Sequence, residues 1–189
     1  MPPTRCLRDP MKRTVQLTHA TVSDLDVVES WLRDGRVCRW LGGVRIMETT
    51  YMEDVRKDPH GPGYVAKMHK LAAREVGHDD GPPVGYVAAT VYGVSVIEDR
   101  WTVRSPYYAT LLYAVDPDCH RGGLGAATLQ ATIDHPDLAE ITEFHCGIAV
   151  RNIASRRIAR RVGFVIQPEP RPIPRRRRRI LSYVYHRST

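Results

Sequence analysis

The chain has 189 residues, of which 42% are hydrophobic and 26% are charged, a balance typical of a soluble globular domain with a substantial core. No apolar run approaches the roughly 18 residues of a transmembrane helix, so no membrane span is predicted. Six of the seven net positive charges lie in one segment, 171–179, which argues against a surface that coats nucleic acid.

The cysteines and the N-terminal segment give further expectations. The four cysteines form no closely spaced pair, so neither a disulfide framework nor a metal site is predicted, and the expected location is the reducing cytoplasm. Residues 1–13 carry charge without an apolar core and are not a signal peptide. They are expected to be a flexible leader before a single domain at 14–189.

The domain is expected to begin with a strand and a helix. Val15 and Leu17 alternate with polar residues, as in a strand that is buried on one side. Thr21 or Ser23 can cap the helix that follows, and Gly35 is expected to end it.

The next segments predict a connection, a short helix and three strands. The connection at 37–45 is rich in turn residues, and the helix at 47–59 closes at a proline. Strands are expected at 63–76, 84–97 and 107–117. The last of these is too apolar to have one face in water, so it is predicted to be central in the sheet.

The second half alternates helices and strands. A helix is expected at 123–134, a buried strand at 143–150, a helix in 152–164 that ends at Gly163, and a terminal hairpin after it. This order predicts an α/β (α+β) fold, a mixed sheet with helices on both faces.

A glycine-rich loop separates the central strand from the helix at 123–134. Gly122, Gly123 and Gly125 leave the backbone bare where a helix N-terminus can bind an anion. A nucleotide P-loop would need lysine and then serine or threonine after the last glycine, but Ala126 follows. A dinucleotide fingerprint would need glycine or alanine at Thr128, and it would lie near the start of a domain.

Two motifs carry a family resemblance. AVDPDCHRGGLGAATLQA at 114–131 resembles the acyl-CoA motif of the GCN5-related N-acetyltransferases (GNAT), V-x-P-x-x-(Q/R)-x-x-G-x-(G/A), with His120 at the Gln/Arg position. NIASRRIARRVGF at 152–164 resembles the second family motif, in which an asparagine opens a helix that ends in Gly-Phe. The element order is similar to the family's over about residues 14–187.

The resemblance implies transfer of an acetyl group from acetyl-CoA directly to an amine, without a metal. It also implies a mostly antiparallel sheet with an acyl-CoA slot between two splayed central strands, 107–117 and 143–150. Asn152 would contact the pantetheine arm, cap its own helix, or do both. The positions implied to bind acetyl-CoA are Tyr113, Ala114, Val115, His120, Arg121, Gly122, Gly123, Leu124, Gly125, Ala126, Asn152 and Ser155.

The resemblance also raises a question about catalysis. Many family members carry a tyrosine acid seven residues after the asparagine, where this chain has Ala159. Either the thiolate leaves without a dedicated acid, or Tyr113, Tyr108, Ser155 or Cys146 replaces the tyrosine. Glu98 and Asp99 are the leading candidate bases, with the acids of 48–54 as alternatives. His145 lies inside a buried strand and is expected to be a hydrogen-bonded core residue.

The acceptor is predicted from a second resemblance. WLRDGRVCRWLGG at 31–43 is similar to a segment of aminoglycoside N-acetyltransferases, so Trp31 and Trp40 are expected either to line the acceptor pocket or to pack the first helices. Glu48 is a further candidate, because the resemblance implies that its region borders the acceptor site. A small-molecule amine, with aminoglycosides among the candidates, is favoured over a protein or peptide acceptor.

A different class of function stays open. A non-catalytic family member would hold acyl-CoA, or would have lost it, and use the arginine run Arg175–Arg179 to bind a partner. The same run could be a solvated hairpin tip, an anion contact or a contact to the CoA 3′-phosphate. Homodimerisation is also left open.

Overall fold

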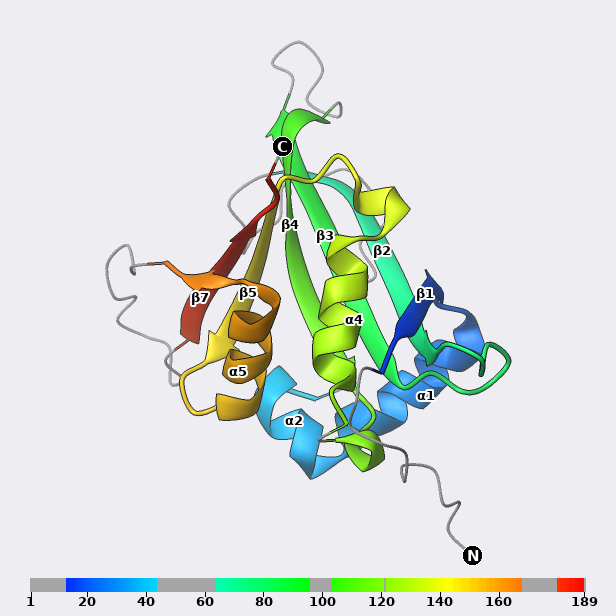
Figure 1. The fold of residues 1–189 in the computed structure, drawn as a ribbon. Helices are drawn as coiled ribbons and strands as arrows, with labels where there is room; N and C mark the ends of the chain where they lie inside the picture. The colour runs from blue at the N-terminus through cyan, green and yellow to red at the C-terminus, as the bar shows by residue number, and fades with distance from the viewer. Residues whose placement is uncertain (1–12, 44–63, 96–102, 121, 168–179, 189) are drawn as a thin grey trace, which may run out of the picture.

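The structure is a computed structural model that describes residues 13–43, 64–95, 103–120, 122–167 and 180–188. In these residues, helices pack against one seven-stranded sheet of order β1-β2-β3-β4-β5-β7-β6 (Figure 1). The strands are β1 (Val15–His19), β2 (Tyr64–Glu75), β3 (Gly85–Ser95), β4 (Val103–Val115), β5 (Glu143–Ala149), β6 (Val165–Ile166) and β7 (Ile180–His186). The helices are α1 (Val22–Arg33), α2 (Gly35–Leu41), α4 (Leu124–Ile133) and α5 (Ile153–Val162), with the 3-10 turns η1 (Pro117–Cys119) and η2 (Pro136–Leu138).

The pairing of the strands confirms the predicted fold class. All neighbouring strands are antiparallel except β4 and β5, which are parallel. A parallel pair needs a long crossover, and α4 supplies it. β6 and β7 form the predicted terminal hairpin, and α5 ends at the predicted Gly163. None of the helices in the described part of the chain combines the length and apolarity of a membrane span.

The two faces of the sheet are covered by different helices, as predicted (Figure 1). Successive side chains of a strand point to opposite faces. On β3, Val87 and Ala89 pack into the core beneath α4 and α5, whereas Tyr86 and Ala88 pack with α1 and α2. The sheet is therefore a central layer between α4 and α5 on one side and α1 and α2 on the other.

The connection predicted at 37–45 is wrong in its first half, because residues to Leu41 are helical. α1 ends at Arg33 rather than at Gly35, and Gly35 begins α2. The reason is Asp34, whose carboxylate accepts the amide hydrogen of Arg36 at 2.7 Å and so starts a new helix one residue after the first ends.

The start of α1 matches one of the two predicted caps. Thr21 is the N-cap and forms a reciprocal capping box with Asp24. Three other predicted features lie outside the described residues: the leader predicted at 1–13, except for its last residue, Arg13, the helix at 47–59 and the run Arg175–Arg179.

The contact of α4 with β3 predicts a steric requirement at Gly85. A Cβ added there would lie 2.6 Å from Thr128 Oγ1 on α4. We expect Gly85→Ala to lower the free energy of unfolding by about 1–3 kcal/mol, because the added methyl overpacks the core. Urea unfolding measures this change.

Thr128→Ala removes the opposing atoms and supplies the control. In that background Gly85→Ala is expected to cost much less. An equal cost in both backgrounds would show that the contact with Thr128 is not the cause.

Candidate active site

A tight turn joins β4 to α4. Asp116 caps η1, since its carboxylate accepts the amide hydrogen of Asp118 at 2.9 Å and its carbonyl accepts that of Cys119 at 2.9 Å. The Cys119 thiol is buried and donates to Asp116 Oδ2 at 3.7 Å. These contacts give the cysteine a structural role and bring the chain round to Gly123, where α4 begins.

Each of the three glycines in this loop has its own structural reason. A Cβ at Gly122 would lie 2.9 Å from the guanidinium of Arg13, a contact that the sequence did not reveal. Gly123 has φ +79°, in the left-handed region that disfavours other residues. A Cβ at Gly125 would lie 2.7 Å from Ile158 Cδ1 on α5. Together the three glycines and the burial of the Leu124 side chain leave the backbone at the start of α4 free of exposed bulky side chains.

The bare loop exposes the positive end of a helix. Gly123 is the N-cap of α4, and no side chain accepts hydrogen bonds from the first turn. A ten-residue helix concentrates about half a positive charge at such an end. An anion that brings its own oxygen acceptors fits this arrangement. Five positions predicted to bind acetyl-CoA, Gly122 to Ala126, lie here, and a sixth, Arg121, lies outside the described residues.

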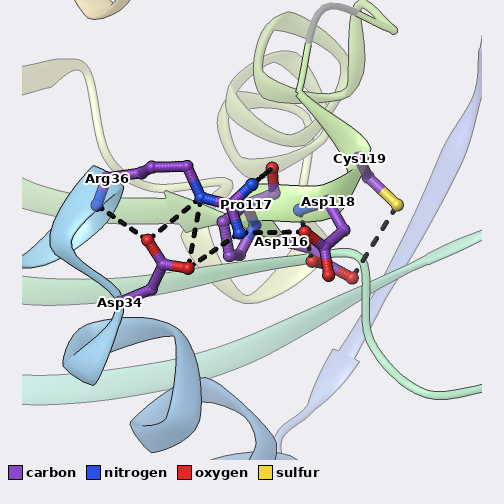
Figure 2. Close-up of polar contacts among 6 residues, drawn as sticks. All are labelled: Asp34, Arg36, Asp116, Pro117, Asp118 and Cys119. Atoms are coloured by element: carbon purple, nitrogen blue, oxygen red, sulfur yellow. Dashed lines mark hydrogen bonds and ion pairs between the residues drawn. The ribbon is translucent and has the colours of Figure 1, made fainter.

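Arg36 ties this loop to the first helices (Figure 2). Its guanidinium donates to Asp118 Oδ1 at 2.9 Å and to the Pro117 carbonyl at 3.2 Å, and it also pairs with Asp34. The hydrogen bonds from Arg36 lower the pKa of Asp34 to about 2. The ions are exposed, so solvent screens their attraction. Arg36 therefore positions the turn more than it stabilises the fold.

β4 and β5 pair only briefly and then separate. Their ladder joins Tyr108–Thr110 to Glu143–His145, after which β4 continues to Val115 and β5 to Ala149. The predicted slot between two splayed strands is confirmed by this register. Among the described strands, none pairs with the edge of β4 that faces β5 beyond Thr110. The predicted positions Tyr113, Ala114 and Val115 lie along that stretch.

Two of the predicted catalytic residues lie together on the α5 side of the slot. The Tyr113 hydroxyl donates to the backbone carbonyl of Ser155 at 3.3 Å. Burial raises the pKa of Tyr113, so its hydroxyl keeps its proton at neutral pH. Asn152 caps α5, because its side-chain oxygen accepts the Ser155 amide hydrogen at 3.2 Å. Ala159, where the family's tyrosine would be, is fully buried.

The side chains of His145 and Glu143 lie at the point where β4 and β5 separate, which we call the vertex. His145 Nε2 lies 2.5 Å from Glu143 Oε1, and the His145 ring meets the edge of Tyr108, which stacks on Tyr92. The His145 side chain is 30% exposed, so the expectation of a core histidine is wrong, although its hydrogen bond is present. The i, i+2 spacing of Glu143 and His145 could have indicated this pair, because residues at that spacing lie on one face of a strand.

The remaining predicted residues fall in two groups. Glu98, Asp99 and Glu48 lie outside the described residues. Trp31 is 5% exposed and packs in the core between α1 and the sheet, which favours a packing role. Trp40 is half-buried on α2. His120, at the Gln/Arg position of the motif, is exposed at the end of η1.

The acid–base candidates lie on opposite faces of the sheet. Tyr113 packs with Ala109 and Leu111 in the core beneath α4 and α5. His145 contacts Tyr108, whose side chain alternates to the face of α1 and α2. A group held in the slot between the strands is therefore accessible from one side to His145 and from the other to Tyr113.

Comparison with known proteins agrees with this geometry. A family model described as an acetyltransferase (GNAT) domain matches residues 14–165. A sequence search of curated proteins gives no match.

Similar solved structures include an aminoglycoside N(6')acetyltransferase from Legionella pneumophila, 14% identical with a TM-score of 0.64, covering 93% of this chain and 94% of that one. The aminoglycoside acetyltransferase AAC(6')-Ib in complex with coenzyme A is 16% identical, with a TM-score of 0.62 and coverage of 92% and 95%. Spermidine N-acetyltransferase from Vibrio cholerae, in complex with coenzyme A and spermine, is 12% identical, with the same TM-score and coverage. At such identities the likeness shows the fold alone.

The family model spans most of the chain, from the residue before β1 to the start of β6. It includes the loop before α4, the separated strands β4 and β5, and α5. The chain therefore belongs to the GNAT acetyltransferases and is an acyltransferase that takes its acetyl group from acetyl-CoA.

Proposed function

We propose that the protein transfers the acetyl group of acetyl-CoA directly to a primary amine of a small cationic molecule, with aminoglycosides and polyamines as the first candidates. The observation that carries this proposal is the separation of β4 from β5 beside the glycine-rich N-terminus of α4. The start of α4 offers a phosphate site, and the separated strands β4 and β5 offer a slot. A single short turn joins β4 to α4.

The phosphate site and the slot fit the two halves of acetyl-CoA. The pyrophosphate is assigned to the amides of 122–126, where the helix dipole favours negative charge. The pantetheine arm carries amide groups of its own, so it can pair with the edge of β4 between Leu111 and Val115 as an added strand would. An amide on that edge would also polarise the thioester carbonyl.

His145 is assigned as the base. The amine attacks the thioester carbonyl carbon, and a C–N bond forms as the C–S bond breaks. His145 takes the proton that the amine loses, and Glu143 orients the imidazole through the 2.5 Å contact. The exposed fraction of His145 allows a base inside the sheet to meet a substrate that arrives from solvent.

Tyr113 is assigned to the departing sulfur. Its hydroxyl keeps its proton and reaches the α5 side of the slot. A tyrosine with a raised pKa is a weak acid toward a thiolate, whose ordinary pKa is near 8.5. The hydroxyl therefore stabilises the leaving thiolate mainly by a hydrogen bond rather than by complete proton transfer, and for this its one proton turns from the Ser155 carbonyl to the sulfur.

The side chains at the vertex support a cationic acceptor. Tyr92 and Tyr108 present stacked rings next to the carboxylate of Glu143. Aromatic faces and a carboxylate both attract an ammonium group. Trp40 and Glu48 stay predictions for the outer part of the acceptor site.

Two substitutions at Gly123 test the phosphate site. Asn and Asp have nearly the same size and both tolerate a positive φ, so they differ mainly in charge. Acetyl-CoA at 100 times its dissociation constant is expected to raise the wild-type melting temperature by about 5–10 °C. Gly123→Asp is expected to abolish this rise, whereas Gly123→Asn keeps at least half of it. Equal rises in the two variants would contradict the assignment.

Substitutions at His145 and Tyr113 test the two catalytic assignments. We expect His145→Gln to lower kcat by a factor of about 100 or more and Tyr113→Phe by about 10 or more, with little change in the KM for acetyl-CoA. Steady-state kinetics with a saturating amine measure both effects.

Tyr183→Phe is the matched control for Tyr113→Phe. Tyr183 is also buried in the same core, but its hydroxyl accepts a hydrogen bond from Arg156. This variant is expected to keep kcat. A similar loss in both tyrosine variants would show a packing effect rather than a role in catalysis.

A panel of amines tests the proposed function itself. Release of CoA thiol is followed with kanamycin, with spermidine and with an unblocked peptide, and the products are weighed for one added acetyl group. Turnover with the small cations is expected. Turnover only with the peptide would identify a protein acetyltransferase, and binding of acetyl-CoA without turnover of any amine would identify a non-catalytic member.

A further inference from the structure

A group of histidines and an aspartate lies at the C-terminal end of α4, the end away from the candidate active site. His19 is the last residue of β1, and His69 lies two residues from its partner Leu71 on β2. Both therefore project from the face that α4 covers. His135 and Asp137 belong to the turn that follows α4 and forms η2. Three separate segments thus converge on one point.

The donor atoms in this group are at ligand spacing. His19 Nε2 is 2.8 Å from Asp137 Oδ2, and His69 Nδ1 is 3.6 Å from the same oxygen. All three atoms lie within 4.8 Å of one another. Four ligands around a zinc ion at about 2.0–2.2 Å are about 3.3–3.5 Å apart. His19 and Asp137 are partly exposed, so small rotations can bring the three atoms to that spacing.

His69 shows that the group is more than a surface ion pair. Its side chain is 1% exposed, and its Nδ1 has no hydrogen-bond partner among the described residues. The distance to Asp137, 3.6 Å, is too long for a hydrogen bond. A buried polar atom without a partner costs free energy, and the contact of His19 with Asp137 does not relieve that cost. The atom lies within 4.8 Å of both other donor atoms.

Burial also keeps this ring in the form that a metal needs. Desolvation lowers the pKa of His69, so the imidazole is neutral and one of its nitrogens carries a lone pair. The positive charge of Lys67 also lowers the pKa of His69. Lys67 lines the adjoining pocket and opposes a cation there, whereas Asp137 and Glu140 line the same pocket with negative charge.

We propose that His19 Nε2, His69 Nδ1 and Asp137 Oδ2 form a binding site for a divalent transition metal, with Zn²⁺ as the best fit. Two imidazoles and one carboxylate suit Zn²⁺ and its neighbours in the first transition series, whereas Mg²⁺ and Ca²⁺ prefer oxygen ligands. Acetyl transfer in this family needs no metal, and the site lies at the other end of α4 from the slot.

A metal ion at this site would have room for a further ligand, and it would stabilise the folded chain. A pocket of about 190 Å³ is lined by His69, Asp137, Glu140 and Lys67. Three protein ligands would leave a zinc ion with an open position, and the pocket beside His69 and Asp137 offers space for a further ligand. A bound ion would join β1, β2 and the turn after α4, and so would stabilise the folded chain.

Thermal unfolding with metal ions tests this site without reference to enzymatic activity. We expect Zn²⁺ at 100 times its dissociation constant to raise the melting temperature by about 5–10 °C, and equal concentrations of Mg²⁺ or Ca²⁺ to leave it unchanged. His19→Ala and Asp137→Asn are each expected to weaken Zn²⁺ binding at least tenfold. Both side chains are partly exposed, so each variant can be checked for folding by its melt without metal.

His78→Ala is the matched control, because His78 is an exposed histidine in the turn between β2 and β3. It is expected to keep the full response. The spectrum of the Co²⁺ complex separates this site from the cysteines, since His and Asp ligands give no thiolate charge-transfer band. No rise in the wild-type protein, an unchanged response in His19→Ala, or a thiolate band would each overturn the proposal.

Discussion

Strands β4 and β5 form a parallel ladder of three residue pairs and then separate, and the candidate active site depends on this short ladder. The ladder holds the two strands at one end, so that the other end can open without breaking the sheet. Beyond it, the edge of β4 retains backbone groups that a substrate with amides of its own can pair with. The turn from β4 into α4 places the positive end of a helix next to that edge. In the proposed function, binding and catalysis both depend on where this pairing stops.

The glycines of the loop show how one sequence feature can have several physical causes. Gly122 and Gly125 have no side chains because Arg13 and Ile158 occupy the space where a Cβ would lie. Gly123 itself is required by its backbone conformation. None of these reasons involves a ligand directly. The shared result, a glycine-rich helix N-terminus, is nevertheless what a phosphate group needs.

Much of the fold was predictable because its signals are local. Alternating apolar residues, the cap at Thr21 and the stop at Gly163 specify strands and helices over a few residues each. The start of α2 was missed because Gly35, read as a stop, follows a cap, Asp34, that begins a new helix. The positions expected to form the acyl-CoA loop were predictable because the family motif is continuous along the chain and has a fixed spacing.

The other features of the sites depend on register, which the sequence does not display. His145 was expected in the core, and its place at the vertex depends on the point at which β5 leaves β4. The ligands of the proposed metal site are far apart along the chain, so no short motif contains them. They meet because β1 pairs with β2 and because the turn after α4 brings Asp137 to the end of β1 and to the middle of β2.

Hydrogen exchange of backbone amides, with and without saturating CoA, tests the central claim most directly. It reports on single stretches of chain, and CoA does not turn over during the measurement. If acetyl-CoA lies along β4 and on the start of α4, amides in 111–115 and 123–127 will exchange more slowly when CoA is bound. Unchanged exchange in both stretches, with protection elsewhere, would show that the slot between β4 and β5 is not where the cosubstrate binds.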